Sequence, residues 1–366
     1  MRHSIKKILR TLAALCTVGT LLVSCSGNAA MKYGSLSISE NEFRYYLATY
    51  KGRYADTYRD FKNTHEYFAA EVDDGGTMRT AEDILYSAVL HNVSMTLVSE
   101  VMFGEYKLSV PRSAEDTINS YIKDYITEYA DGNRNFFNSE LGEYGINISM
   151  LKKIYIRDEK TAVLFNHLYG DGGVYGVTDA DREAYLNDNY VRVRHIYVND
   201  RYAYATDENG VLEYTSEGVA KTRALTDEEY AAKRALIDAI ESSLAEGGDF
   251  EEVYDAFSED KYYKNGYYLT RGTDFISDVT SSAFELEVGE YTKVDSDYGT
   301  HYIMRLEMDE KPWESDDNSD FFTNYNTTVA EYLFTTLIES RIGEVEINTE
   351  ITDKYSMEAS PINRRF

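Results

Sequence analysis

Cysteine and proline are scarce in this sequence, and their scarcity excludes two kinds of protein. Only 2 of the 366 residues are cysteine, so at most one disulfide bond can form and the fold must rely on packed hydrophobic cores. Only 3 residues are proline and 43% are hydrophobic, a composition that excludes a disordered linker protein. A chain of 366 residues is too long for one compact domain by the usual range, so we predict two or three units.

Positive charge is also in short supply. The chain has 37 Lys and Arg residues against 64 Asp and Glu residues, which gives a formal net charge of −27. A chain this acidic repels the phosphates of nucleic acids, so we exclude DNA and RNA as partners. A solvated surface that keeps the protein soluble is the simplest interpretation of the charge, and a role in repelling or attracting partners is the alternative.

The first 25 residues have the order of a bacterial lipoprotein signal. Four basic residues in MRHSIKKILR precede the apolar run TLAALCTVGTLLV, which is too short to span a bilayer comfortably and fits the apolar region of a signal peptide. The next residues, Leu22-Val23-Ser24-Cys25, resemble a lipobox, at which the cysteine is acylated and the chain is cut before it. We therefore predict a signal peptide over residues 1–24 and lipidation of Cys25. An ordinary signal peptide with an incidental cysteine is the alternative.

This prediction determines the expected location of the protein. Cleavage before Cys25 removes Cys16, so the mature chain has no disulfide, and it also removes four positive charges. Two or more acyl chains make membrane attachment effectively stable. We expect an extracytoplasmic protein that is lipid-anchored to the bacterial cell membrane.

Residues 30–188 show helical spacing almost throughout. Four long segments and a short one before residue 190 carry apolar residues at helical intervals. Ser39 with Glu42 predicts a capping box at the first helix, and Ser113 is the predicted N-cap of the third. The region is therefore expected to be almost all helical.

The pattern changes at residue 191. VRVRHIYV reads as a strand, and a polar stretch follows in which Asn209-Gly210 predicts a small hairpin. A capping box of Thr226 and Glu229 opens a long helix, and later segments predict a short helix, a strand, a third helix and a closing hairpin around residues 296–299. The predicted order is β-α-α-β-α-β-β, followed by one more long helix and a short strand-like piece.

Two histidines lie in the first and last strands of this predicted unit. His195 lies among valines in the first strand, and His301 lies in the last. In an antiparallel sheet these strands can be neighbours and bring the two rings together. Two unrelated, half-buried histidines are the alternative interpretation.

The motifs of residues 189–310 resemble a parvulin-type peptidyl-prolyl isomerase domain. The matching stretches are VRVRHIYV, LIDAIESSLAEGGDFEEVYDAFSED, NGYYLTRG and SSAFELEVGEYTKVDSDYGTHYIMRLE, in family order and with family spacing. With the lipobox and the helical first half, the whole chain resembles PrsA-type foldase lipoproteins, which combine a SurA-like helical chaperone region with a parvulin domain. The resemblance implies an α+β fold, with a small antiparallel sheet surrounded by short helices beside an all-α chaperone region.

The resemblance also implies roles for individual residues. His195 and His301 match the paired family histidines, Asp260 matches the position that faces the isomerised amide, and Ser296 matches a hydroxyl that binds the histidines. The proline-binding wall is expected from the three apolar residues Leu269, Phe275 and Val279. Two departures are visible: the pocket pair is Phe275 and Val279 with one inserted residue, and the usual Gly-Gly-Asp-Leu-Gly is replaced by KNGYYL.

The implied reaction is a rotation about an X-Pro bond, for which no bond needs to be cleaved. The amide must lose its resonance to cross a barrier of about 20 kcal/mol. The site needs an apolar slot for the proline ring and a polar network suited to the twisted amide, so we expect no metal and no cofactor. The loop over residues 199–225 is acidic, unlike the basic phosphate-reading loops of phospho-specific relatives, so we expect no preference for phosphorylated substrates.

These observations lead to a domain plan and a function. We expect a signal peptide over 1–24, a helical chaperone region over 25–188, an isomerase domain over 189–310, and a C-terminal helix and tail over 311–366 that packs back on the helical region. The expected function is a membrane-anchored foldase that isomerises X-Pro bonds. The expected partners are unfolded or newly secreted proline-containing polypeptides, the membrane through Cys25, and a second copy in a homodimer.

Two other functions stay open. One is a non-catalytic chaperone or holdase with a degenerate parvulin fold, for which the 34 tyrosines offer adaptable contact area, although ordinary packing explains many of them. The other is a solute-binding lipoprotein, which the helical first half disfavours because such proteins usually show two α/β lobes.

Overall fold

The computed structural model describes residues 29–263, 265–273 and 275–366. The predicted signal peptide and Cys25 lie outside these described residues. The chain forms two compact units: unit 1 contains the residues up to 176 together with 330–366, and unit 2 contains residues 177–329. The predicted boundaries after residues 188 and 310 both lie inside unit 2.

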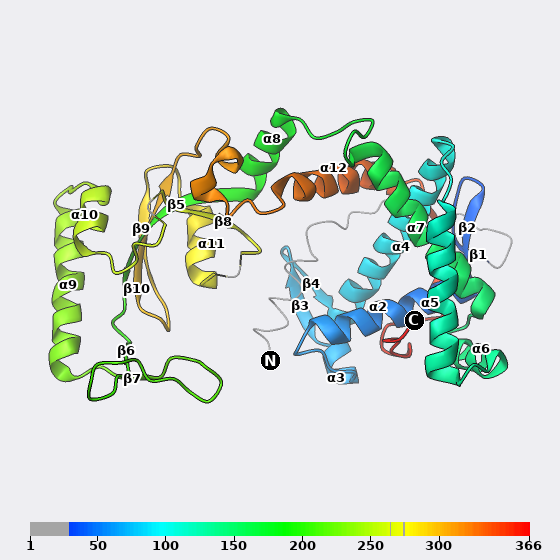
Figure 1. The fold of residues 1–366 in the computed structure, drawn as a ribbon, viewed down its shortest axis with the longest axis horizontal. Coiled ribbons are helices and arrows are strands. Elements are labelled where there is room, and N and C mark those ends of the chain that lie inside the picture. Colours follow the sequence, from blue (N-terminus) through cyan, green and yellow to red (C-terminus); the bar gives the residue numbers. More distant parts are fainter. Residues whose placement is uncertain (1–28, 264, 274) are drawn as a thin grey trace. The chain divides into compact units, whose positions relative to one another are not determined.

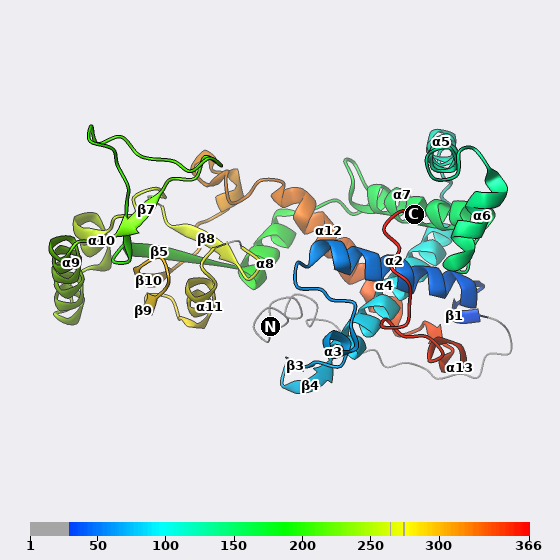
Figure 2. The same cartoon turned by 90° about the horizontal axis from the view of Figure 1, so that it is seen from below.

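Unit 1 is mainly helical (Figures 1 and 2). Its helices are α2 (Glu40–Thr57), α3 (His65–Phe68), α4 (Ala81–Glu105), α5 (Arg112–Ala130), α6 (Arg134–Glu143), α7 (Ile148–Tyr169), α13 (Thr349–Thr352) and the larger part of α12 (Tyr325–Ile342). Helix α2 begins at the predicted capping box, in which Ser39 and Glu42 bond each other. Helix α5 does not begin at the predicted N-cap, Ser113. Its N-cap is Pro111, whose side chain offers no hydrogen-bond acceptor.

Four short strands and a fifth from the chain's far end also belong to unit 1. They are β1 (Ala29–Tyr33), β2 (Leu36–Ser39), β3 (Glu71–Asp74), β4 (Thr77–Thr80) and β11 (Glu346–Ile347). Strands β11, β1 and β2 form one antiparallel sheet in which Met31 faces Ile347, and β3 pairs with β4. The expectation that residues 30–188 are almost all helical is wrong for β1 to β4, because strands of four or five residues give too short an alternation to predict.

Helix α4 is the core helix of unit 1. It contacts α2, α7 and both strands of the β1–β2 hairpin. Among the described residues it is the one helix whose length and composition would allow it to cross a membrane, and 61% of its apolar window is buried inside the protein. Burial of this kind is typical of the central helix of a soluble fold.

A buried ion network joins three of these helices. The Arg157 side chain of α7 is 2% exposed and donates to Glu42 of α2 at 3.1 Å and to Glu100 of α4 at 2.6 Å. Lys153 and Lys160 pair with the same two carboxylates from the protein surface. Every charge in the network therefore has an opposite partner, which is the condition for charged groups to be buried.

Unit 2 is built on one four-stranded antiparallel sheet with the order β8-β5-β10-β9. Its elements are α8 (Asp179–Asn189), β5 (Tyr190–Val198), β6 (Tyr202–Tyr204), β7 (Thr222–Ala224), α9 (Asp227–Ala245), α10 (Phe250–Phe257), β8 (Tyr267–Thr270), α11 (Ser277–Glu285), β9 (Tyr291–Asp295), β10 (Thr300–Leu306) and the short turns η1 (Pro312–Glu314) and η2 (Asp316–Asn318). The predicted order β-α-α-β-α-β-β is confirmed, with β6 and β7 added between the first two elements. The predicted α+β class is also confirmed.

The sheet of unit 2 carries a different core on each face (Figures 1 and 2). On one face Ile196 and Tyr302 pack with residues of α9 and α10. On the other face Val193 and Ile303 pack with Val279 of α11. The alternation of VRVRHIYV produces this division, because successive side chains of a strand point to opposite faces.

We predict that loss of the central charge of the ion network unfolds unit 1. Arg157→Ala leaves Glu42 and Glu100 buried without their shared partner, which costs about 3–5 kcal/mol of unfolding free energy. Urea unfolding followed by helical circular dichroism measures the loss.

Arg341→Ala is the matched control. Arg341 pairs with Glu105 at 2.7 Å on the surface, where such pairs contribute about 0–1 kcal/mol. Equal losses in the two variants would contradict the importance of the buried network.

Candidate active site

The structure brings the two histidines of unit 2 into direct contact. His195 lies in β5 and His301 in the neighbouring strand β10. Their Nε2 and Nδ1 atoms are 2.9 Å apart, and their rings lie within 14° of parallel. The side chains are 4% and 1% exposed, so each ring takes its hydrogen-bond partners from the protein.

Both ends of the histidine pair bind another predicted site residue. Asp260 Oδ2 lies 2.9 Å from Nδ1 of His195. Ser296 Oγ lies 2.7 Å from Nε2 of His301. The four predicted polar residues therefore form one hydrogen-bond chain in the order Asp260, His195, His301, Ser296, which we name the relay.

The proton positions along the relay follow from its acidic end. An ionised Asp260 only accepts, so a His195 ring that carries one proton carries it on Nδ1, and its Nε2 then accepts from Nδ1–H of His301. Nε2 of His301 must then accept the hydroxyl proton of Ser296. All donors point toward Asp260, and each ring has a single tautomer.

The electrostatics of the site agree with this assignment. Burial, followed by the adjacent His195, lowers the pKa of His301 to about 4, so the ring stays neutral. Burial alone would raise the pKa of Asp260, but hydrogen bonds from His195, Tyr267 and the backbone N–H of Tyr262 hold it below its usual value.

Two loops fix the ends of the relay. Ser258 Oγ, at the end of α10, accepts from the backbone N–H of Tyr197 at 3.1 Å and donates to the carbonyl of Asp260 at 3.0 Å, which ties the acidic end to β5. The turn between β9 and β10 carries Ser296, whose Oγ also accepts from the N–H of Tyr298 at 3.0 Å.

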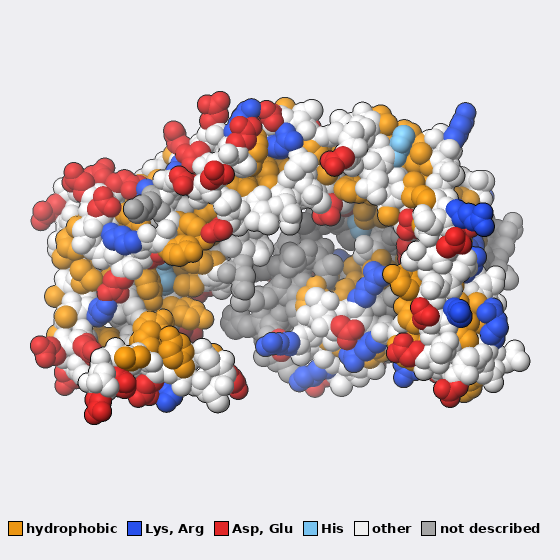
Figure 3. Space-filling model, viewed as in Figure 1, with side chains coloured by type: hydrophobic (Ala, Val, Ile, Leu, Met, Phe, Trp, Pro, Cys, Tyr) orange, Lys and Arg blue, Asp and Glu red, His pale blue; other side chains and the backbone are white. Residues whose placement is uncertain are grey.

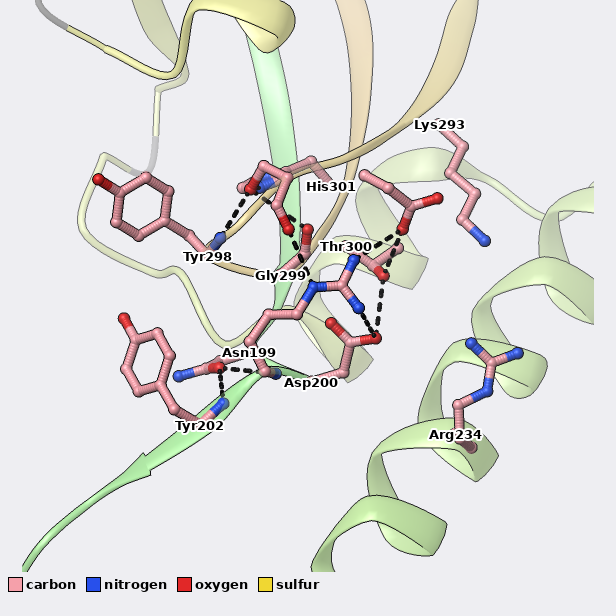
Figure 4. Close-up of polar contacts among 12 residues, drawn as sticks. Asn199, Asp200, Tyr202, Arg234, Lys293, Tyr298, Gly299, Thr300 and His301 are labelled. Atoms are coloured by element: carbon pink, nitrogen blue, oxygen red, sulfur yellow. Dashed lines mark hydrogen bonds and ion pairs between the residues drawn. The ribbon is translucent and has the colours of Figure 1, made fainter. Parts of the chain in front are cut away.

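The Ser296 turn is held from the end of β5 (Figure 4). Arg201 Nε donates to the carbonyl of Ser296 at 2.9 Å, and its guanidinium also meets Asp200 and Asp295. A Cβ on Gly299 would lie 2.3 Å from the carbonyl of Val198, so this close approach requires glycine.

The three predicted apolar residues do not share one position. Phe275 is half-buried and packs edge-to-face on His195, with ring centroids 5.7 Å apart. Leu269 and Val279 are 1% and 0% exposed and belong to the core beneath the sheet. Only Phe275 of the three lies at the surface beside the relay, and the other two support it from behind.

Sequence reasoning missed several residues of the site. Tyr267 donates its hydroxyl to Asp260 and packs against Phe275 at 5.6 Å, and Tyr263 and Phe321 extend this aromatic wall. Tyr197 stacks with both histidines, with centroids 5.9 and 5.1 Å away. The signal for Tyr267 was the KNGYYL departure, in which a tyrosine follows Gly266, whereas nothing in the sequence marked Phe321.

Among residues 29–263, 265–273 and 275–366, no group of three or more His, Cys, Asp or Glu side chains is arranged to hold a metal ion.

Comparisons with known proteins give structural similarities of low degree. No protein-family model and no curated protein matches the chain. The crystal structure of PrsA from Bacillus subtilis matches at 18% identity and a TM-score of 0.24, over 78% of this chain and 93% of that one. The crystal structure of peptidylprolyl isomerase (PrsA) from Bacillus cereus matches at 16% identity and a TM-score of 0.26, over 78% of this chain and 91% of that one. The solution structure of NmPin, the parvuline of Nitrosopumilus maritimus, matches at 20% identity and a TM-score of 0.20, over 32% of this chain and 97% of that one. Similarities this low establish no family, so the function rests on the geometry of the site.

We predict that unit 2 loses stability as the pH falls from about 6.5 to about 4. In this window an unfolded chain binds a proton at His301 that the folded chain does not, so unfolding becomes easier by up to about 3 kcal/mol. Above about 6.5 both states are neutral and the full stability is present. The only tryptophan, Trp313, lies in unit 2, so its fluorescence during urea unfolding reports the change.

His301→Gln provides the comparison, because it removes the titrating ring. Its unfolding free energy should depend less on pH between 4 and 6.5 than that of the unchanged protein. An identical pH dependence would contradict the buried, neutral state of His301.

Proposed function

We propose that this protein is a peptidyl-prolyl cis-trans isomerase that acts as an extracytoplasmic foldase. The observation that carries the proposal is the relay of Asp260, His195, His301 and Ser296, lying against the half-buried Phe275 and the aromatic wall beside it. A polar network with fixed tautomers next to a partly accessible apolar ring is what rotation about an X-Pro bond requires.

We assign the relay the role of holding its side chains in fixed positions rather than of transferring protons. When the amide twists, conjugation is lost and the planar, dipolar ground state gives way to a less polar arrangement. Aromatic surroundings from Phe275 and Tyr267 disfavour the polar planar amide relative to the twisted one. Asp260 is more exposed than either histidine, with a side chain that is 16% exposed, so we assign it the direct contact with the substrate.

The histidines hold Asp260 in position. Each buried ring uses both nitrogen atoms within the relay, so movement of one member leaves its neighbour without a partner, at a cost of roughly 1–3 kcal/mol. We therefore assign His195, His301 and Ser296 as positioning residues, and Leu269 and Val279 as support for the apolar wall.

The foldase role rests on the N-terminal signal together with the relay. Lipidation of Cys25 would place unit 2 outside the cytoplasm, where newly secreted, proline-containing polypeptides are the available substrates. The same lipid group accounts for the proposed attachment to the bacterial cell membrane.

A second candidate function is a holdase that binds unfolded chains without isomerising them. Its support is a cavity of about 650 Å³ in unit 1, walled largely by aromatic side chains: Tyr45, Tyr46, Tyr50, Tyr121, Tyr125, Tyr155 and Phe366. Asp158 also lines this cavity, and burial raises its pKa to about 6. Tyrosine surfaces of this kind suit adaptable contacts with a polypeptide.

We predict that Asp260→Ala lowers isomerisation of a proline tetrapeptide by roughly ten- to a hundredfold in kcat/KM, because a charged contact of the twisted amide is lost. Asp297→Ala is the matched control, since Asp297 is an exposed neighbour of Ser296 outside the relay. Suppression of aggregation by a protein that shows no isomerisation would favour the holdase instead.

A separate prediction concerns the sequence before proline. Phosphoserine-proline peptides should be isomerised no faster than serine-proline peptides, because the arm beside the site, residues 199–225, exposes Asp207, Glu208 and Glu217. Competition between the two peptides at low salt measures the preference. A clear gain in rate for the phosphorylated peptide would refute it.

A further inference from the structure

The polar stretch 199–225 folds into an arm that leaves the end of β5 (Figure 1). Its ends pair as β6 and β7, and two tight turns between them close further backbone hydrogen bonds. The paired residues are Tyr204 with Thr222, Thr206 with Leu212 and Tyr214 with Ala220. The predicted turn at Asn209-Gly210 is the first of the two turns, where Gly210 has a φ of 80°.

One face of this arm is apolar and exposed. Side chains alternate along a strand and antiparallel partners share a face, so Tyr202, Tyr204, Leu212 and Tyr214 project to the same side. The last three are 51%, 42% and 55% exposed. Figure 3 shows hydrophobic side chains gathered over the arm. An apolar face on an exposed element is a feature of interaction surfaces.

Aromatic rings connect this face to the relay. The ring of Tyr202 meets that of Tyr204 edge-to-face at 5.8 Å. Burial, followed by the neighbouring phenol of Tyr202, raises the pKa of Tyr197, whose ring stacks on His301. Tyr197 also donates its hydroxyl to the carbonyl of Tyr298 at 2.8 Å, in the turn that carries Ser296.

The root of the arm is fixed to the site. Asn199 Oδ1 accepts from the backbone N–H groups of Arg201 and Tyr202, both at 3.2 Å. In Figure 4 the rings of Tyr202 and Tyr298 extend to the same side of the end of β5. The arm therefore continues the surface of the candidate active site.

We propose that the aromatic track, defined as Tyr197, Tyr202, Tyr204, Leu212 and Tyr214, binds the client polypeptide next to its prolyl bond. The proposal rests on the proposed isomerase function for the position of that bond. The preferred client segment is extended and carries aromatic or aliphatic side chains, which match the exposed face. Acidic segments are disfavoured, because the turns of the arm expose Asp207, Glu208 and Glu217.

The length of the track fits a short segment. A strand rises about 3.3 Å per residue, so the face from Tyr202 to Thr206 extends on the order of 13 Å, enough for about four extended client residues. Tetrapeptide substrates reach little of it, whereas longer peptides can lie along it.

The test compares two peptides of roughly twelve residues, each with one proline. This length is enough to cover both the candidate active site and the track. One carries Phe and Leu beside the proline and the other carries Ser and Gly there; each is made with the variable segment before or after the proline. The full chain should isomerise an aromatic peptide with a kcat/KM roughly tenfold higher than that of its partner.

The variant Tyr204→Ser/Leu212→Ser/Tyr214→Ser should reduce this ratio to about one, because a tenfold preference corresponds to a few lost apolar contacts. The matched control is Val211→Ser/Val219→Ser, since both valines are 61% exposed in the turns and lie outside the track. The control should keep the ratio. An unchanged ratio in the triple variant, or an equal fall in both variants, overturns the proposal.

Binding separates the proposal from the proposed function. If the unchanged protein isomerises neither peptide, the isomerase function fails, but fluorescence anisotropy of a labelled aromatic peptide still measures binding to the track. Weaker binding by the triple variant alone then supports the track as a binding site. Equal binding by all three proteins rejects it. The competing occupant of the track is a second copy of the chain, and light scattering in the same samples measures whether a dimer forms. The proposal is also rejected if the triple variant alone loses a dimer while its peptide preference is unchanged.

Discussion

The hydrogen bond between the rings of His195 and His301 is the contact on which the site of unit 2 depends. It joins the first long strand of the unit to the last, and it fixes the tautomer of both rings because neither has water as an alternative partner. Asp260 and Ser296 are held at its two ends, so loops from distant parts of the chain are aligned by one buried contact.

Much of unit 2 could be predicted from the sequence because its signals are local. Alternation in VRVRHIYV placed His195 on the same face as Val193, and the capping box at Thr226 and Glu229 marked the start of α9. The turn around residues 296–299 marked the hairpin of β9 and β10, the strand that carries His301. Each of these inferences needs only an alternation of side chains, a helix cap or a turn. All three signals depend on a few consecutive residues.

Other parts of the site could not be predicted because their partners are remote in the chain. Tyr267 acts through Asp260, and Phe321 joins its ring from a segment more than fifty residues later. The burial of Leu269 and Val279 depends on how α11 lies on the sheet, which no periodicity specifies. In unit 1, β1 is a strand because it pairs with β2 and with the remote β11, and its own five residues are too few to indicate it.

The pairing of Met31 with Ile347 has a consequence for how this protein comes into being. The whole of unit 2 is inserted between the two strands, so it emerges complete while β1 still lacks one neighbour. A chain stalled before residue 346 would have a complete unit 2 while the sheet of unit 1 still had an open edge, the kind of backbone that invites wrong pairing. Until β11 is made, the sheet of unit 1 is therefore the part of the chain most open to wrong pairing.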